Sequence, residues 1–425
     1  MLKTVQKSKP LKGEITIPAD KSISHRAVML SSFARGKCTI KNFSSGADCQ
    51  STLNIFKQLG VEVNIIDKKT IEIVSNGKLK KSLIPLDAGN SGTTTRLLSG
   101  ILAGQIFDSE IIGDESLSKR PMKRIILPLT QMGAKINSID NHLPLTIYGQ
   151  KLHGIVYHTP ISSAQVKSCI LLAGLNAEGQ TTVIEPTQSR NHTELMLKYL
   201  GADILTYNNE ITVSPSELTA KNIEIVGDIS SAAFFIAAGL IVPNSDFVIK
   251  NVGINPTRTG ILDVVKRMCG EVNLFNKRIV SGEECADIKV HYTESLKGCV
   301  IEGDDIPRLI DELPVIAVLA SQAEGETIVK NAEDLRNKEA DRITCLVTEL
   351  KKIGVNIEET SDGFIIRGKC NLQGDAELET YHDHRLAMSF YIAGLVCEKE
   401  ISINGFEWTN ISFPEFEELF NQLNA

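Results

Sequence analysis

The segment LVTELKKIGVNI (346–357) contains a helix, the end of that helix and the strand that follows it. Its apolar residues, extended one turn backwards, recur at helical spacing on one stripe: Ile343, Leu346, Val347, Leu350 and Ile353. Gly354 occupies the position where a helix end favours a left-handed residue. Val355 and Ile357 then alternate with polar residues, as a half-buried strand requires. The segment therefore predicts an amphipathic helix, a glycine cap and a strand.

The same order occurs in four earlier segments. These are STLNIFKQLGVEVNI (51–65), PLTQMGAKINSI (128–139), LMLKYLGADIL (195–205) and VVKRMCGEVNLF (264–275). The glycines of the five copies follow one another at intervals of about 70 residues, which indicates one supersecondary unit used several times.

A second set of segments alternates with the first. Its members are HRAVMLSSFARGKCTIKNF (25–43), TTRLLSGILAGQ (94–105), AQVKSCILLAGLNAEGQTTVIEP (164–186), SSAAFFIAAGLIVPNSDFVIKNV (230–252), ELPVIAVLASQAEGETIVKNA (312–332) and HRLAMSFYIAGLVCEKEISINGF (384–406). Most are apolar nearly all round, which is typical of helices buried on every side. We predict six repeats, each with a buried helix, an amphipathic helix and short strands.

Polar and charged residues immediately precede each buried helix. The segments are ADKSISHR (19–26), AGNSGTTTR (88–96), SSAQVK (162–167), VGDISS (226–231), LIDE (309–312) and HDHR (382–385). Helix amino ends present unpaired N–H groups, so added hydroxyls, lysines and arginines make an anion site. Good helix capping is the alternative interpretation. Capping does not explain Lys21, Arg26, Arg96 and Arg385, because a cation there opposes the helix dipole.

Two further segments concentrate charge. SLSKRPMKR (116–124) is either part of the anion site or a solvated basic loop. In LRNKEADRI (335–343) a continuous helix would place Lys338 and Arg342 at i and i+4 on one face, unless nearby carboxylates form surface pairs with them. Asp311 and Glu312 lie at the start of an apolar segment, where a carboxylate is a candidate base or a cap.

Length and composition exclude several classes of protein. A chain of 425 residues exceeds the usual size of one core, so we expect two domains. The net charge of −7 predicts no nucleic-acid or membrane partner. Nine scattered cysteines without a C-x-x-C pair, no long apolar run and no signal-like start favour a cytoplasmic protein without disulfides or a zinc site.

Nine motifs in one order resemble a known family. They are PADKSISHR, GNSGTTTR, KRPMKR, SSAQVK, SRNHTE, GDISSA, IDELP, NKEADR and DHRLAM, and they span essentially the whole chain. This set resembles the 5-enolpyruvylshikimate-3-phosphate synthases of the shikimate pathway, which leads to chorismate and the aromatic amino acids. Single motifs are weak, but nine in order are specific.

The resemblance implies an α/β fold, a two-domain inside-out α/β barrel of six β-α-β-α-β-β repeats (the enolpyruvyl transferase fold). The chain is expected to cross between domains near Ala19 and Gly227. One domain then comprises residues 20–227, and the other comprises 1–19 and 228–425. The active site is expected in the cleft between them, in a monomer.

The resemblance also implies the reaction and its residues. The enolpyruvyl group of phosphoenolpyruvate passes to the 5-hydroxyl of shikimate 3-phosphate, and phosphate is released. The residues that match the shikimate 3-phosphate contacts are Lys21, Ser22, Arg26, Ser163, Gln165, Ser189, Asp311 and Lys338. Those that match the phosphoenolpyruvate site are Lys21, Gly92, Arg120, Gln165, Arg342 and Arg385.

Three of these residues match catalytic groups. Asp311 matches the proposed base for the 5-hydroxyl, and Glu339 matches the group proposed to protonate the methylene carbon of phosphoenolpyruvate. Lys21 competes with or assists Glu339 in this step. No cofactor or metal is expected, because protein cations neutralise the phosphate, and His382 with His384 has no third ligand.

Two departures and two rivals remain open. Many family members carry a lysine where this chain has Ile411. RPMKR, SAQVK, RNHTE and NPTR resemble the second, often glyphosate-insensitive class, yet Gly92 is retained, so glyphosate tolerance is undecided. The rivals are a UDP-N-acetylglucosamine enolpyruvyl transferase, disfavoured by Lys21-Ser22 and a cysteine-free ESLSKRPMKR, and a non-catalytic anion-binding protein of the same fold.

Overall fold

The computed structural model describes residues 1–424 and divides into two compact units. The inserted unit consists of Ala19–Ile225 together with Val280–Glu283. The discontinuous unit consists of Met1–Pro18, Val226–Ile279 and Glu284–Ala425. Each unit contains three of the six β-sheets.

The inserted unit has seven α-helices, which are α1 (Lys21–Phe33), α2 (Ala47–Gln58), α3 (Gly92–Ala103), α4 (Glu115–Ser118), α5 (Lys123–Gln131), α6 (Ala164–Gly174) and α7 (His192–Tyr199). Its strands are β3 (Ala34–Lys41), β4 (Glu62–Ile65), β5 (Ile71–Asn76), β6 (Leu86–Asp87), β7 (Ser109–Ile112), β8 (Lys135–Ile139), β9 (His142–Tyr148), β10 (Val156–His158), β11 (Thr181–Ile184), β12 (Ile204–Tyr207), β13 (Glu210–Val213), β14 (Leu218–Thr219) and β15 (Ile223–Glu224).

The helices of the discontinuous unit are α8 (Ile229–Ile241), α9 (Gly260–Arg267), α10 (Asp305–Leu309), η1 (Ile310–Glu312), α11 (Leu313–Ser321), η2 (Glu333–Asn337), α12 (Arg342–Lys352), α13 (His384–Gly394), η3 (Phe406–Ile411) and α14 (Phe416–Leu423). Its strands are β1 (Leu2–Val5), β2 (Lys12–Thr16), β16 (Asp246–Gly253), β17 (Val272–Val280), β18 (Glu283–His291), β19 (Val300–Ile301), β20 (Gly325–Val329), β21 (Ile357–Thr360), β22 (Gly363–Gly368), β23 (Ala376–Glu379) and β24 (Ile401–Asn404).

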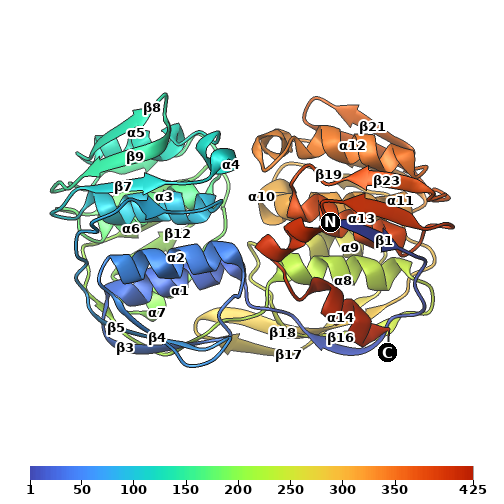
Figure 1. Ribbon diagram of the computed structural model, residues 1–425, viewed down its shortest axis with the longest axis horizontal. Helices are drawn as coiled ribbons and strands as arrows, with labels where there is room; N and C mark the ends of the chain where they lie inside the picture. The colour runs from blue at the N-terminus through green and yellow to red at the C-terminus, as the bar shows by residue number, and fades with distance from the viewer. Residues whose placement is uncertain (425) are drawn as a thin grey trace. The chain divides into compact units, whose positions relative to one another are not determined.

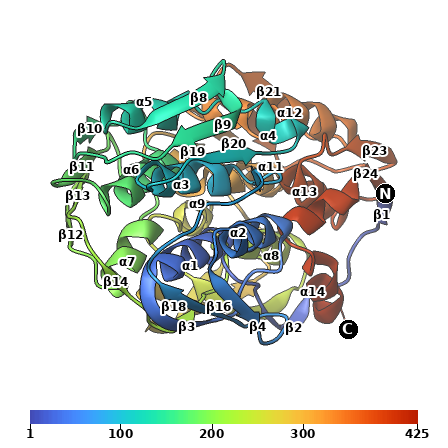
Figure 2. The ribbon, with the colours of Figure 1, turned by 60° about the vertical axis from the view of Figure 1, so that its left-hand side comes forward.

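The predicted repeat is confirmed in the sheet topology. In the order β6-β7-β9-β8, the first pair is parallel and the other two are antiparallel. The sheets β10-β11-β13-β12 and β19-β20-β22-β21 repeat this pattern. A parallel pair needs a helical crossover, which α3, α6 and α11 supply, and Figure 2 shows β8 beside β9 within one such sheet.

Three sheets are completed by segments distant in sequence. The parallel neighbours of β3 are β14 and β15, from the end of the inserted unit's long segment. The amino-terminal strand β2 lies parallel to β16, and β1 lies antiparallel to β24. Strands from outside a repeat therefore cover sheet edges that the repeat itself leaves open.

The apolar helices lie inside each unit and the sheets lie outside them (Figure 1). Every residue of α11 is buried, and α11 packs against α8 and α13. In the inserted unit, α3 and α6 approach so closely that a Cβ on Gly100 would lie 2.1 Å from the carbonyl oxygen of Cys169. The Ala- and Gly-rich segments thus allow close helix packing.

The glycine caps explain why each amphipathic helix ends where it does. Gly354 has a φ of +96°, as predicted, and Gly60, Gly133 and Gly201 also have positive φ. In the remaining copy the left-handed residue is Cys269, with a φ of +61°. A Cβ on Gly270 would lie 2.6 Å from the Val265 side chain, so that glycine is required by close packing.

Within residues 1–424, no helix combines the length and the apolar character needed to cross a membrane.

Candidate functional site

The amino end of α1 brings the first predicted residues together. The Asp20 carboxylate caps the helix by accepting a hydrogen bond of 2.8 Å from the Ile23 N–H. Lys21 is the first helical residue, and its Nζ lies 2.9 Å from Oδ2 of Asp48 in α2. The carbonyl oxygen of Ser22 accepts a hydrogen bond from Arg26. Asp48 was not predicted from the sequence, because capping and ion-pair roles of an Asp in a first turn look alike.

Arg26 is a buried cation whose described hydrogen bonds go to uncharged groups. It is 3 % exposed, and it donates from Nε to Thr193 Oγ1 (2.7 Å) and from Nη2 to Ser168 Oγ (2.9 Å). Burial lowers the pKa of Arg26 to about 10, partly offset by Glu194, so the group stays charged at neutral pH. A buried guanidinium held by hydroxyls suits an anionic ligand.

A chain of neutral side chains connects three helices of the inserted unit. His25 Nδ1 lies 2.7 Å from Thr52 Oγ1, Thr52 Oγ1 lies 2.7 Å from Thr94 Oγ1, and Thr94 donates to Ser91 Oγ at 2.7 Å. Burial lowers the pKa of His25 to about 3, so the ring is neutral at physiological pH. Since Ser91 caps α3, this chain fixes the start of α3 relative to α1.

The start of α3 gathers the residues that match the phosphoenolpyruvate site in this unit. A Cβ on Gly92 would lie 3.1 Å from Nη1 of Arg96 and 3.6 Å from Nη1 of Arg120. Arg96 Nη1 donates to Gln165 Oε1, and Arg120 Nη2 donates to Asn90 Oδ1 at 3.1 Å. Gly92 is therefore surrounded by guanidinium groups, and Gln165 belongs to the same cluster.

The two predicted serines precede α6 and α7. Ser163 stands before α6 without a side-chain capping hydrogen bond. Its neighbour Ser162 instead ties the two loops together, because its Oγ donates to the Thr187 carbonyl and accepts from the Thr187 N–H. Ser189 is 4 % exposed, and its hydroxyl has no hydrogen-bond partner among residues 1–424. Neither predicted hydroxyl is a helix cap.

A fully buried ion cluster lies behind these serines. Lys167 Nζ lies 2.7 Å from Glu185 Oε2 and 2.7 Å from Glu194 Oε1. Lys167 and Glu194 occur within the motifs SSAQVK and SRNHTE, but this cluster was not predicted from them. A lysine usually lies at the surface, and its distant partner Glu185 gives no local signal.

In the discontinuous unit, Asp311 lies among the predicted cations. Its Oδ1 is 3.5 Å from Nζ of Lys338 and 3.5 Å from Nη1 of Arg342. Its carbonyl oxygen accepts a hydrogen bond of 3.1 Å from Arg385 Nη1. Three cationic side chains thus contact Asp311, two at its carboxylate and one at its carbonyl oxygen.

Arg342 is the buried centre of this second cluster. It is 2 % exposed and donates to Asp383 Oδ2 from Nε at 2.7 Å and to Glu339 Oε2 from Nη2 at 2.6 Å. Burial alone would lower the pKa of Arg342, but the charges of Asp383, Glu339 and Asp311 raise it above its ordinary value. Asp383 also caps α13, because its carboxylate accepts from the N–H groups of Arg385 and Leu386. In the sequence it is therefore indistinguishable from an ordinary helix cap.

One prediction about this region is wrong. Lys338 and Arg342 do not share a helix face, because α12 begins at Arg342 and Lys338 has an extended ψ of −153°. Asp341 caps α12 there, and its carboxylate also pairs with Arg336 at 2.9 Å. Lys338 and Arg342 nevertheless share Asp311 as a partner.

The carboxylate next in sequence to Asp311 is completely buried. Glu312 Oε1 accepts a hydrogen bond from Ser230 Oγ and lies 3.6 Å from Arg385 Nη1. Ser230 Oγ in turn accepts a hydrogen bond of 2.7 Å from Arg258, the arginine of NPTR. Through Glu312, this network contacts the Arg385 guanidinium.

His382 makes an aromatic contact. Its ring stacks on Trp408 with 4.7 Å between ring centroids, and no group of three metal-ligating side chains exists among residues 1–424.

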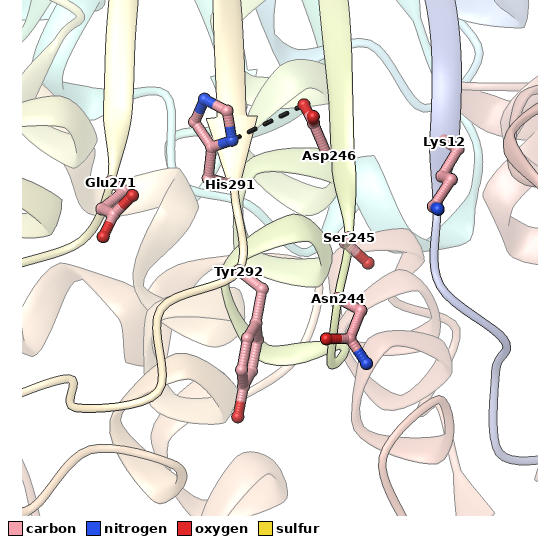
Figure 3. Close-up of a pocket in the computed structure, with 7 residues that line it drawn as sticks. All are labelled: Lys12, Asn244, Ser245, Asp246, Glu271, His291 and Tyr292. Carbon is pink, nitrogen blue, oxygen red and sulfur yellow. Dashed lines mark ion pairs between the residues drawn. The ribbon is translucent and has the colours of Figure 1, made fainter.

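A polar pocket of about 500 Å³ lies apart from both clusters (Figure 3). It is lined by Lys12, Asn244, Ser245, Asp246, Glu271, His291 and Tyr292. Figure 3 shows His291 and Asp246 pointing toward one another, 3.5 Å apart, and Lys289 also pairs with Asp246. None of the predicted site residues lines this pocket.

Comparisons with known proteins identify the family of this chain. The family model described as EPSP synthase (3-phosphoshikimate 1-carboxyvinyltransferase) matches residues 5–420. This chain belongs to the EPSP synthase family. The resemblance inferred from nine ordered motifs is thereby confirmed.

Individual relatives of the EPSP synthase family match over their whole length. A 3-phosphoshikimate 1-carboxyvinyltransferase of Thermoanaerobacter pseudethanolicus is 52 % identical over 424 residues, covering 99 % of each chain. One from Thermodesulfovibrio yellowstonii is 51 % identical, with 100 % of each chain covered.

The solved structures extend the match to the fold. EPSP synthase from Acinetobacter baumannii has a TM-score of 0.89 and 43 % identity, covering 99 % of this chain and 98 % of that one. The enolpyruvyl transferase NikO from Streptomyces tendae has a TM-score of 0.82 at 17 % identity, covering 100 % and 97 %, which supports the fold alone. The predicted two-domain enolpyruvyl transferase fold is confirmed.

Proposed function

We propose that the two residue clusters form one active site in this 3-phosphoshikimate 1-carboxyvinyltransferase. The enzyme transfers the enolpyruvyl group of phosphoenolpyruvate to the 5-hydroxyl of shikimate 3-phosphate and releases phosphate. The observation that carries the proposal is the placement of Asp311 within 3.5 Å of both Lys338 and Arg342, with Glu339 on the same arginine.

Shikimate 3-phosphate is bound mainly by residues of the inserted unit. The Arg26 guanidinium and the hydroxyls of Ser22, Ser163 and Ser189 supply donors for its phosphate and hydroxyl groups, since a charged donor and the buried, unpartnered Ser189 hydroxyl favour an oxyanion. Lys338 and Asp311 contact the ring of shikimate 3-phosphate, and Gln165 and Lys21 lie toward phosphoenolpyruvate.

Phosphoenolpyruvate is bound by arginines of both units. Arg120 and the backbone at Gly92 contribute from one unit, and Arg342 and Arg385 from the other. Guanidinium forks bind carboxylate and phosphate through paired hydrogen bonds, which an ammonium does not match. The proposal requires that the domains 20–227 and 1–19 with 228–425 reach the same pair of substrates, and that closure of the cleft excludes water.

The chemistry is an addition followed by an elimination. Asp311 takes the proton of the 5-hydroxyl while that oxygen forms a bond to C2 of phosphoenolpyruvate, and Glu339 or Lys21 gives a proton to C3. Glu339 then removes a methyl proton from the tetrahedral adduct, the C2–C3 double bond re-forms, and the C–O bond to phosphate breaks. Arg342 suits Glu339 for both proton transfers because its hydrogen bond orients the carboxylate.

No cofactor or metal enters this scheme, because the guanidinium groups supply the charge that stabilises the departing phosphate. We further propose that the enzyme acts as a cytoplasmic monomer. Sedimentation at micromolar concentration tests the oligomeric state.

The decisive assay measures release of inorganic phosphate from phosphoenolpyruvate with two acceptors in parallel. Release with shikimate 3-phosphate and none with UDP-N-acetylglucosamine is expected. Release with the sugar nucleotide alone would reject the proposal, and no release with either acceptor from the folded protein would favour a binding protein.

A further inference from the structure

The buried ion cluster of the inserted unit joins three elements. Lys167 on α6 contacts Glu185 at the end of β11 and Glu194 on α7, and the side chains of Lys167 and Glu185 are both 0 % exposed. Burying a charge without partners costs several kcal/mol, so each of these groups depends on the others.

The same cluster holds Ser189 by both of its backbone polar groups. The Ser189 N–H donates to Glu185 Oε2 at 3.2 Å, and the Ser189 carbonyl oxygen accepts from Lys167 Nζ at 3.3 Å. The hydroxyl of this buried serine has no partner among residues 1–424. The backbone is therefore fixed while the hydroxyl stays available.

The cluster also flanks the partners of Arg26. Ser168, which accepts from Arg26 Nη2, follows Lys167 on α6. Thr193, which accepts from Arg26 Nε, precedes Glu194 on α7. A shift of Lys167 would therefore move Ser189 and both side-chain acceptors of Arg26 together.

Charge attraction alone would not place two carboxylates here. With one ammonium and two carboxylates, the cluster carries a formal charge of −1 when all three are ionised, which opposes an anion. Its value at this position lies in hydrogen-bond geometry, since Glu185 Oε2 accepts from Lys167 and from Ser189 at once.

We propose that Glu185, held by Lys167, is a positioning residue that presets the Ser189 hydroxyl and Arg26 for the phosphate of shikimate 3-phosphate. This inference rests on the proposed function, in which Ser189 and Arg26 bind that substrate. Preset donors lose less conformational entropy when the ligand binds, so the effect appears in the affinity for one substrate.

Two substitutions separate geometry from charge. Glu185→Gln keeps the length of the side chain and an acceptor oxygen but loses the charge. Glu185→Asp keeps the charge but withdraws the oxygen from Ser189. We expect Glu185→Asp to raise KM for shikimate 3-phosphate about tenfold, which equals about 1.4 kcal/mol. Glu185→Gln should stay within about twofold of the parent enzyme, and KM for phosphoenolpyruvate and kcat should change little in either variant.

The opposite order, with Asp neutral and Gln impaired, would overturn the inference in favour of charge balance. Equal increases in both KM values would indicate a general scaffold role, and no change in either variant would also reject it. If Glu185→Asp does not fold, Glu185→Gln decides alone, since a tenfold rise in its KM for shikimate 3-phosphate contradicts the proposal.

A second measurement tests the route through Ser189. In a Ser189→Ala background, Glu185→Asp should add less than twofold to KM, because coupled residues are non-additive. Additive effects would exclude this route. Glu349 is a matched control, because it also accepts from a lysine (Lys352, 2.7 Å) and from a backbone N–H (Glu379, 3.0 Å). Glu349→Asp and Glu349→Gln should leave both KM values unchanged.

The parent enzyme separates this inference from the proposed function. If it releases phosphate with shikimate 3-phosphate and the Glu185 variants behave alike, only the inference fails. If it shows no such activity, the proposed function fails first.

Discussion

Arg26 and Arg342 are both buried arginines, but different kinds of groups stabilise their charges. Arg26, at 3 % exposure, donates to Thr193 and Ser168, and burial lowers its pKa to about 10. Arg342, at 2 % exposure, contacts Asp383, Glu339 and Asp311, and these carboxylates raise its pKa. One guanidinium is solvated by neutral oxygens and the other by ions.

The difference separates binding from chemistry. A cation held by hydroxyls keeps its charge for an incoming phosphate, so its cluster is suited to affinity. A cation held by carboxylates orients those carboxylates, so its cluster is suited to proton transfer. The two clusters should therefore respond differently to substitution.

Asp311→Asn is expected to give the largest effect. The isosteric amide keeps the shape of the side chain but removes the proposed base, so kcat should fall by about 10²- to 10⁴-fold. Steady-state kinetics with shikimate 3-phosphate varied should show KM within a few-fold of the parent. An increase in KM as large as the loss of kcat would indicate that Asp311 binds the substrate instead of acting as the base.

Removing each arginine should reveal its different surroundings in stability. Arg342→Met leaves Asp383, which is 0 % exposed, without its counter-ion and should lower the free energy of unfolding by about 3–5 kcal/mol. Arg26→Met leaves only neutral acceptors unpaired and should cost about 1–3 kcal/mol.

Urea unfolding of both variants measures this contrast. Equal losses would mean that ions and hydroxyls stabilise these two buried arginines equally well.

The neutral chain of the inserted unit predicts a pH dependence of stability. The pKa of His25 is about 3 in the folded protein, below the usual value of 6.5, so the unfolded chain takes up the proton first. Stability should fall as the pH drops below 6.5, by about 1.4 kcal/mol per pH unit until the folded pKa is reached. His25→Gln lacks this term.

Between pH 7 and pH 5 the parent should therefore lose about 2 kcal/mol more than His25→Gln. Denaturant unfolding at both pH values is the measurement. Parallel pH profiles would show that His25 accepts a proton inside the fold, contrary to its neutral role.

Arg26→Lys should give the smallest effect, and it tests whether substrate binding needs the guanidinium group or only a positive charge. Lysine keeps the positive charge but not the fork that reaches Thr193 and Ser168, so KM for shikimate 3-phosphate should rise about tenfold. KM for phosphoenolpyruvate serves as the internal control. An unchanged KM for shikimate 3-phosphate would mean that charge alone suffices at this position.

Local patterns in the sequence predicted much of the molecule. Helix stripe, cap and strand lie within a few residues of one another, so the repeat around Gly354 was predictable, as were the polar helix starts that carry Arg26 and Asp311. The left-handed Cys269 was not, because the close contact of Gly270 with Val265 depends on packing.

Features that join distant segments were missed for a different reason. Nothing in the residues around Glu185 marks it as the partner of Lys167. The start of α12 at Arg342 has a local signal, since Asp341 is a favoured capping residue, but the prediction for Lys338 and Arg342 did not use it. The pairing of β14 and β15 with β3 likewise depends on tertiary contacts. Partner choice across the fold is a property of the packed chain.

The placement of β1 and β2 has a consequence for biosynthesis. Strands β1 and β2 precede the inserted unit in the chain, yet β2 pairs with β16 in mid-chain and β1 pairs with β24 near residue 400. Strand β2 can therefore pair only after β16 has been synthesised, and β1 must wait, unpaired, until β24 has been synthesised. The inserted unit has no such dependence on the last repeat, so the nascent chain can complete one half of the protein while the other half still lacks its final strand partner.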